Sequence, residues 1–337
     1  MTVAGRALVA GGGGFLGSHL CRTLVRARYR VYCLDNFLTG DRAGIADLVA
    51  EAAGAPSDRR RFTVIEEDVN SPPDLRVDYV FHLASPASPV DYARWPLETL
   101  LANSQGTLNL LKLARKSGAR FLLASTSEVY GDPQVHPQPE SYWGNVNSTG
   151  PRSCYDEGKR FAEALTVAFR DRYGLDCRIA RIFNTYGPGM KAADGRLVPN
   201  FITQALRGEP LTVYGDGSQT RSLCYVDDLI RGICLAMFSP QGRGEVFKLG
   251  NPEERTVLEL ARLIIRLSSS SSPVAFRPLP TDDPVRRRPD ISKAVKLLGW
   301  APGVPVVEGL DRTIRWFEVN LNPPARAQEA LTDSLRN

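Results

Sequence analysis

A run of glycines close to the start of the chain follows a short apolar segment, Ala7–Ala10. The glycines span positions 11 to 17, and residues with helical periodicity follow over Gly17–Arg28. Glycines at a strand-to-helix turn permit a tight bend, let the backbone approach a pyrophosphate and let the helix pack closely on the strand. The N-terminus of that helix offers free amides and a partial positive charge to phosphates. The pattern therefore predicts a Rossmann-type fold that binds a dinucleotide at this turn.

An acidic residue follows the second predicted strand, Arg30–Leu34. Asp35 comes roughly 20 residues after the glycines, where a carboxylate accepts a hydrogen bond from a ribose 2′-hydroxyl. The same carboxylate would repel a 2′-phosphate, so we expect NAD as the cofactor and not NADP. The alternative interpretation is a glycine-rich turn followed by a solvated aspartate.

The first half of the chain alternates short apolar runs with helical stretches, which is typical of βαβ units in a doubly wound parallel sheet. Because such a sheet is covered on both faces, its strands are apolar without strict alternation. The strands are expected at Ala7–Ala10, Arg30–Leu34, Phe62–Glu66, Tyr79–Leu83, Arg120–Ser125 and Asp176–Ile182. Helices are expected at Gly17–Arg28, Pro96–Ser117 and Tyr155–Tyr173.

The texture of the sequence changes after Gly187, where prolines and glycines multiply and the predicted elements become shorter. We expect an NAD-binding domain over residues 1–187, to which residues 225–248 return through a helix at Val226–Met237. A smaller α/β lobe that binds the substrate is expected over residues 188–320, with a tail over residues 321–337.

The composition excludes several classes of protein. The formal net charge of +5 suits a cleft for an anionic small molecule and does not call for nucleic acid. No apolar run approaches the roughly 20 residues of a membrane span, and the N-terminus lacks the pattern of a signal peptide. Six cysteines without C-x-x-C spacing and only three histidines argue against a metal site and against a disulfide framework. We therefore expect a soluble cytoplasmic protein with reduced thiols and no metal.

Tyr155 and Lys159 are placed four residues apart, on one face of a predicted helix. A phenol is a poor base at neutral pH, and lowering its pKa by about three units takes roughly 4 kcal/mol. A neighbouring ammonium and a cationic nicotinamide ring can supply that stabilisation. The spacing alone is more typical of an ordinary helix surface, so the interpretation depends on the residues that accompany it.

Those residues are Thr126, Ser127 and Glu128, which end an apolar strand. Ligands gather at the carboxyl ends of strands in open α/β sheets. Thr126 is expected to share a hydrogen bond with a reacting hydroxyl, and Glu128 to act as an acid–base group or to hold a water. Alternatively, these side chains only cap the next element.

Longer runs of the sequence resemble the extended short-chain dehydrogenase/reductase superfamily and, within it, the UDP-glucuronate decarboxylases, or UDP-xylose synthases. The runs are His82–Pro89, Leu123–Pro133, Cys154–Arg160, Ala180–Thr185, Leu211–Gly215 and Ser218–Arg221. The resemblance extends from the first strand to Trp300. Two positions depart from the family's pattern: Ala10 replaces a usual threonine, and Gly189 replaces the arginine of a Gly-Pro-Arg-Met run.

The resemblance implies a set of ligand-binding residues. NAD would be held by Gly11, Gly14, Phe15, Leu16, Gly17, Asp35, Asn36, Asp68, Val69, Leu83, Ala84, Tyr155, Lys159 and Thr185. The UDP-sugar would be held by Ser88, Asn184, Arg196, Val198, Asn200, Tyr214, Gln219, Arg221 and Arg287. Arginines suit a diphosphate because they make charge-assisted, often bidentate hydrogen bonds, although residues 286–288 would also make an ordinary solvated basic turn. A homodimer through helices around Pro96–Ser117 and Tyr155–Tyr173 is implied as well.

Ser127 separates this chain from related sugar 4,6-dehydratases, in which the resemblance places an aspartate that protonates a leaving hydroxyl on carbon 6. A uronic acid has a carboxylate there, and two like charges would repel by roughly 1–4 kcal/mol. Serine avoids this cost.

The implied reaction begins when Tyr155 removes the proton of the sugar 4-hydroxyl and NAD accepts hydride from carbon 4. Decarboxylation of the resulting β-keto acid and return of the hydride give UDP-xylose and regenerated NAD. The alternatives are an enzyme that releases the 4-keto pentose with NADH, a 4-epimerase or a dehydratase. A non-catalytic NAD-sensing protein is a further alternative, but it would not need Thr126, Tyr155 and Lys159.

Overall fold

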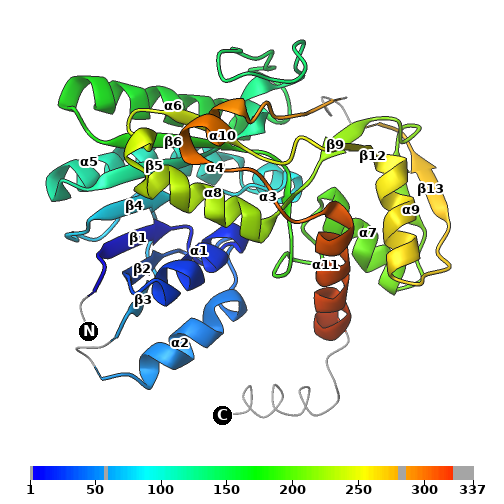
Figure 1. The fold of residues 1–337 in the computed structure, drawn as a ribbon, viewed down its shortest axis with the longest axis horizontal. Helices are drawn as coiled ribbons and strands as arrows, with labels where there is room; N and C mark the ends of the chain where they lie inside the picture. The colour runs from blue at the N-terminus through cyan, green and yellow to red at the C-terminus, as the bar shows by residue number, and fades with distance from the viewer. Residues whose placement is uncertain (1–2, 57–59, 280–285, 322–337) are drawn as a thin grey trace.

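The computed structural model describes residues 3–56, 60–279 and 286–321, so the expected tail lies outside the described residues except for Leu321. A seven-stranded parallel sheet with helices on both faces forms the larger part of the molecule, and a group of short strands and helices packs beside it (Figure 1). The expected α/β architecture is confirmed.

The order of strands in the sheet is β11-β6-β5-β4-β1-β2-β3, and all neighbouring pairs are parallel. Their bounds are β1 Arg6–Ala10, β2 Arg30–Leu34, β3 Phe62–Ile65, β4 Tyr79–His82, β5 Arg120–Thr126, β6 Cys177–Ile182 and β11 Val246–Leu249. The first six agree with the predicted strands to within one residue at each end. The chain order reverses beside β1, between β2 and β4, and ligands bind at such a switch point in open α/β sheets.

Two buried clusters cover the two faces of the sheet. In β1, Ala7 and Val9 face the cluster that contains residues of α1 (Phe15–Arg26), whereas Leu8 and Ala10 face the opposite cluster. Successive side chains of a strand point to opposite faces, so a strand that is buried on both must be apolar throughout. Helices α2 and α8 contribute to the first cluster, and α5 and α6 to the second. Their bounds are α2 Ala46–Ala53, α5 Thr107–Ser117, α6 Ser153–Tyr173 and α8 Val226–Phe238.

The predicted single helix over Pro96–Ser117 is wrong in one respect. The chain forms α4 over Pro96–Leu101, widens into a π-helical turn over Ala102–Gly106 and continues as α5. Asn103 in the wide turn is fully buried, and its side-chain amide donates to Ser85 Oγ at 2.9 Å. Such turns often occur near functional sites, and this one places a polar side chain behind the loop that follows β4.

The smaller lobe consists of short elements that follow β6. The strands pair in twos, as β7 Thr185–Tyr186 with β10 Cys224–Tyr225, β8 Leu211–Tyr214 with β13 Val274–Arg277, and β9 Thr220–Ser222 with β12 Glu254–Thr256. The helices of this lobe are α7 Leu197–Leu206, α9 Val257–Leu267 and α11 Val306–Leu321. Helix α10, Ser292–Leu298, packs instead on α8 and β11 beside the large sheet (Figure 1). A capping box of Thr256 and Glu259 starts α9 by satisfying backbone amides at its N-terminus. In the part of the chain that the structure describes, no helix is both long and apolar enough to cross a bilayer.

Trp300 joins the chain's C-terminal part to α8. Its side chain is fully buried, its indole Nε1 donates to the Asp228 carbonyl oxygen at 2.9 Å, and Gly232 leaves the space in which it lies. We expect Trp300→Ala to lower the free energy of unfolding by about 3–5 kcal/mol, because it removes a large buried ring and leaves a cavity. Trp143→Ala is the matched control, since Trp143 is 88% exposed, and it should change stability by less than about 0.5 kcal/mol. Equal midpoints of urea unfolding for the two variants would contradict this account.

Candidate active site

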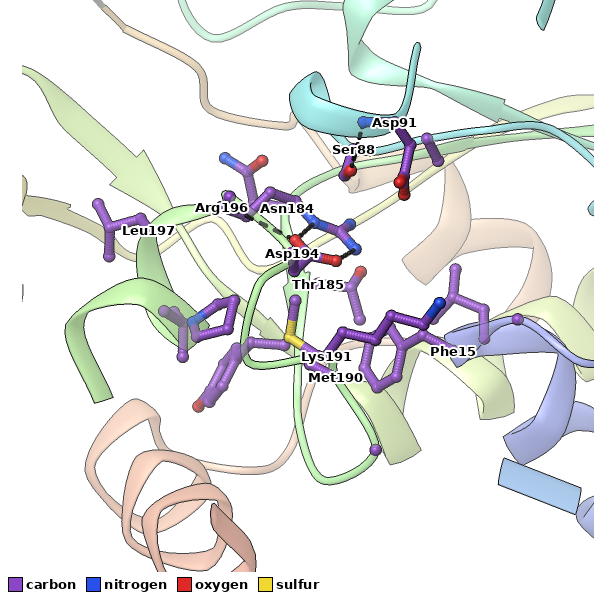
Figure 2. Close-up of a pocket in the computed structure, with 18 of the residues that line it drawn as sticks. Phe15, Ser88, Asp91, Asn184, Thr185, Met190, Lys191, Asp194, Arg196 and Leu197 are labelled. Atoms are coloured by element: carbon purple, nitrogen blue, oxygen red, sulfur yellow. Dashed lines mark hydrogen bonds and ion pairs between the residues drawn. The ribbon is translucent and has the colours of Figure 1, made fainter. Parts of the chain in front are cut away.

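A large pocket opens along the carboxyl ends of the strands at the switch point and continues between α7, β8 and α11. Its volume is about 1470 Å³. Pockets for one small ligand measure roughly 300–1,000 Å³, so this one offers room for a dinucleotide together with a second ligand. Figure 2 shows the part of the pocket where residues of α3 (Pro89–Arg94), of the β6–β7 connection and of the segment before α7 face one another.

The glycine loop forms a cradle that side chains would fill. Gly11 has a φ of +81°, and a Cβ on it would lie 2.6 Å from the backbone nitrogen of Ala84. A Cβ on Gly17 would run into the Gly11 carbonyl oxygen. The strand, the turn and the first turn of α1 therefore approach each other as a bound pyrophosphate requires, and this cradle fits NAD.

Asp35 holds the glycine loop from the side. Its Oδ2 accepts from the Gly13 backbone amide at 2.8 Å, and its Oδ1 accepts from the Phe37 amide at 2.8 Å. Burial raises the pKa of Asp35, while the two amide hydrogen bonds oppose that rise. A ribose hydroxyl would have to share this carboxylate with the loop. Nearby, Asn36 Nδ2 donates to Asp68 Oδ2 at 2.8 Å.

The predicted cofactor residues divide into two groups. Nine line the pocket: Gly11, Gly14, Phe15, Leu16, Gly17, Leu83, Tyr155, Lys159 and Thr185. Five do not form part of its wall: Asp35, Asn36, Asp68, Val69 and Ala84. Val69 is buried against Gly106, and Ala84 is partly buried and lies against Gly11. The contacts of all fourteen with NAD stay predictions.

The end of β5 and the first turns of α6 lie side by side and bring Thr126, Tyr155 and Lys159 together. Lys159 Nζ lies 5.9 Å from the centre of the Tyr155 ring and donates to the Ala124 carbonyl oxygen at 2.9 Å. Burial raises the pKa of Tyr155 to about 12, against the opposing effect of a hydrogen bond with Thr126. Burial also lowers the pKa of Lys159 to about 7, with Glu163 opposing. In the protein alone, the phenol is therefore protonated at neutral pH and the amine has lost much of its charge.

Glu128 lies between two arginines, Arg152 and Arg287, and forms an ion pair with each. Arg287 also donates from Nη2 to the Gly131 carbonyl oxygen at 2.9 Å. Burial by itself would raise the pKa of Glu128, but the two guanidinium groups hold it at about 2. The carboxyl group is therefore ionised at neutral pH, and its role as an acid–base group stays a prediction. Arg287 is buried, so it does not form part of a solvated basic turn.

The nine predicted substrate-binding residues all line the pocket, as do Thr126, Ser127 and Glu128. Ser88 starts α3, because its Oγ accepts from the Asp91 backbone amide at 3.1 Å. Arg196 is held by Asp194, with Nη2 2.7 Å from Oδ2 (Figure 2). Their contacts with a sugar nucleotide stay predictions.

Tyr92 is a pocket residue that the sequence analysis missed. Its ring stacks on that of Tyr155, with centres 5.3 Å apart and an angle of 12° between the planes. Its hydroxyl is buried and has no hydrogen-bond partner among the described residues. An unsatisfied buried hydroxyl costs about 1–3 kcal/mol, so a polar group of a bound ligand would be a favourable partner. Arg152 was missed too, and its position three residues before Tyr155 was the available signal.

The shifted pKa of Lys159 makes stability depend on pH. Between pH 7 and the ordinary lysine value of 10.5, the unfolded chain binds more protons than the folded one, so the contribution of this group to stability rises with pH. From about pH 7.5 to 9, wild type should gain stability relative to Lys159→Met, by up to about 1.4 kcal/mol per pH unit. Urea unfolding of the ligand-free proteins measures this difference. Lys293→Met removes a lysine that pairs with Glu245 outside the pocket and serves as control. Parallel profiles for Lys159→Met and wild type would refute the shift.

Comparisons with known proteins agree with this geometry. The model of the NAD dependent epimerase/dehydratase family matches residues 7–250. UDP-glucuronic acid decarboxylase 1 of Danio rerio is 51% identical over 323 residues, which cover 96% of this chain and 75% of the relative. A crystal structure of a dTDP-glucose 4,6-dehydratase from Streptomyces venezuelae with NAD bound has a TM-score of 0.83 at 32% identity, covering 94% of this chain and 97% of that chain.

A second crystal structure is similar over the same extent. The UDP-glucuronic acid 4-epimerase of Bacillus cereus, in complex with UDP-glucuronic acid and NAD, has a TM-score of 0.82 at 28% identity and covers 94% of this chain and 100% of that chain. The chain therefore belongs to the NAD dependent epimerase/dehydratase family, within which it is similar over almost its whole length to UDP-glucuronic acid decarboxylases.

Proposed function

We propose that this protein is an NAD-dependent carboxy-lyase that converts UDP-glucuronate to UDP-xylose through a UDP-4-keto intermediate. The observation that carries the proposal is the meeting of Thr126, Tyr155 and Lys159 with an arginine-rich wall in one pocket. A sequence identity of 51% to a UDP-glucuronic acid decarboxylase, over 96% of this chain, supports the choice of substrate.

The first chemical step requires a base at the sugar 4-hydroxyl. Tyr155 takes that proton on its phenolic oxygen, Thr126 orients the hydroxyl by a shared hydrogen bond, and Lys159 stabilises the phenolate. NAD, when bound on the glycine cradle, supplies a positive charge and the acceptor for the hydride from carbon 4. A positive charge next to the phenol is needed, because the pKa of Tyr155 in the protein alone is raised to about 12, chiefly by burial.

The second step is loss of the carboxylate. A ketone at carbon 4 lies β to the carboxylate of carbon 6, so the bond between carbons 5 and 6 breaks, carbon dioxide leaves and its electron pair forms an enolate. Ser127 is buried and uncharged in the pocket wall, and it adds no negative charge beside the uronic acid. Protonation at carbon 5 and reduction at carbon 4 then give the pentose. Arg196, Arg221 and Arg287 line the pocket and suit the diphosphate.

One rival reaction has a specific observation in its favour. The Bacillus cereus enzyme that shares this fold binds UDP-glucuronic acid and is a 4-epimerase. Epimerisation keeps the carboxylate, so its product has the mass of the substrate. Release of the 4-keto pentose loses the carboxylate but leaves the cofactor reduced. Product mass and the redox state of the cofactor therefore distinguish both reactions from the formation of UDP-xylose.

The proposal extends to assembly, compartment and domains. A homodimer through α4 and α6 is supported by exposed apolar side chains on these neighbouring helices, namely Leu97, Leu101 and Phe161. A species that sediments as a monomer at micromolar concentration would contradict it.

A cytoplasmic location is supported by six unpaired cysteines, and export into an oxidising compartment in a fractionation experiment would contradict it. The division into a cofactor unit, residues 1–187 with 225–248, and a substrate unit, residues 188–320, is supported by β11 joining the large sheet, and separate expression of the two would test it.

Incubation of the purified protein with UDP-glucuronate tests the reaction directly. We expect release of carbon dioxide and a UDP-pentose by mass spectrometry, with no net absorbance from NADH, because the hydride returns to the sugar. Accumulating NADH would show that the ketone is released, and a product of unchanged mass would show epimerisation.

Replacement of the proposed base tests the mechanism. Tyr155→Phe keeps the ring that stacks on Tyr92 but removes the hydroxyl, so we expect NAD binding to persist while kcat falls by about 10²–10⁴. Tyr173→Phe, at the far end of the same helix and exposed, is the matched control and should retain wild-type kcat. Near-normal turnover by Tyr155→Phe would remove the tyrosine from the mechanism.

A further inference from the structure

A lysine bridges two walls of the pocket that are distant in sequence. Lys191 belongs to the connection between β7 and α7, and its Nζ donates to the carbonyl oxygens of Thr39 at 2.8 Å and of Gly40 at 3.4 Å. Thr39 and Gly40 follow β2 and belong to the segment that begins with Asp35. The contact thus joins the loop on the substrate side to the loop on the dinucleotide side.

The segment that Lys191 reaches is tied to the glycine cradle. The Asp41 amide donates to the Gly13 carbonyl oxygen at 2.9 Å, and the Gly13 amide donates to Asp35. Gly40 lies against Asp35, since a Cβ on it would be 2.9 Å from Oδ1. The positive charges of Lys191 and Arg42 both oppose the rise in the pKa of buried Asp35, and the effect of Lys191 is the larger. Its ammonium therefore acts on the side of the pocket where Asp35 is predicted to meet a ribose of NAD.

Packing contacts and two glycines determine the path of the loop that carries Lys191. The Pro188 carbonyl oxygen lies 2.8 Å from His19 Nε2, Met190 is buried, and Figure 2 shows Met190 and Lys191 in the same part of the pocket as Phe15 of the cradle. On either side of Lys191, Gly189 and Gly195 have φ values of +91° and +82°, a conformation that glycine adopts without strain. The two glycines thus set the path of the segment that brings Lys191 to Thr39 and Gly40.

We propose that Lys191 is a clasp that retains NAD in the pocket by closing this loop onto the Thr39–Gly40 segment. The proposal rests on the proposed function, in which one NAD molecule is reduced and reoxidised within a single turnover. A cofactor lost between the two steps would leave a keto sugar unreduced. Two charge-assisted hydrogen bonds to carbonyls across the pocket slow the opening of this end, so Lys191 sets the rate of cofactor release.

The rate of NAD dissociation from the holoenzyme tests the clasp. Protein loaded with NAD is mixed with an excess of a fluorescent ethenoadenine analogue of NAD, and the rise in bound fluorescence reports release. We expect Lys191→Met to release NAD about tenfold faster than wild type, as loss of a charged hydrogen bond implies, and Lys191→Arg to restore much of the retention. Lys116→Met is the matched control: Lys116 is an exposed lysine that pairs with Asp74 away from the pocket, and its loss should not change the rate.

A second readout is the product. With UDP-glucuronate and no added NAD, Lys191→Met should accumulate UDP-4-keto pentose and NADH, whereas Lys116→Met should not. Faster NAD release without any decarboxylation would leave the clasp standing and overturn the proposed reaction, so the two can fail separately.

Three results would overturn the clasp. One is wild-type NAD release from Lys191→Met, and another is equal acceleration by Lys116→Met, which would indicate a general effect of charge. If the methionine variant does not fold, as judged by its melting curve, Lys191→Gln takes its place, and wild-type release from that variant is the third.

Discussion

The rest of the site depends on the close contact between the strand-to-helix turn and the first turn of α1. Gly11 and Gly17 meet where any side chain would separate them, and Gly11 also touches the backbone of Ala84 at the end of β4. This contact fixes where α1 begins and therefore where its free amides point. Asp35 then joins the end of β2 to the same turn through the Gly13 amide. The ends of β1, β2 and β4 are thus held at one place, and this end of the pocket takes its shape from them.

Burial determines the protonation of Tyr155 and Lys159 in the protein alone. Burial raises the pKa of Tyr155 and lowers that of Lys159, so both move toward their uncharged forms. In the same environment of low polarity, a charge that later enters the pocket interacts more strongly with nearby groups. A cationic ring bound nearby would therefore lower the pKa of the phenol more than it would in water, and in the proposed reaction Tyr155 acts as a base only when the cofactor is present.

Local sequence predicted most of the frame but not the contacts across it. The strands β1 to β6 and the glycine turn follow from apolar runs and from backbone requirements, which neighbouring residues determine. The wide turn at Ala102–Gly106 was missed because its apolar spacing is still helical, and β11 because four residues give too little periodicity. Stacking of Tyr92 on Tyr155 and the ion pair of Arg152 with Glu128 join residues from separate elements, so only the tertiary structure reveals them.

Three arginines of the pocket, Arg152, Arg196 and Arg287, come from different segments of the chain and already form ion pairs. Arg152 directly precedes α6 and Arg287 lies in the segment before α10, and both form ion pairs with Glu128. Arg196 directly precedes α7 and forms an ion pair with Asp194. A buried guanidinium without a counter-charge would be strongly destabilising, and Arg287 is buried. The carboxylates balance the charges of the arginines and orient them before any ligand arrives. An anionic sugar nucleotide must share or replace those partners. The phosphate and carboxylate oxygens of such a ligand can do so, because they accept hydrogen bonds from guanidinium groups as Glu128 and Asp194 do.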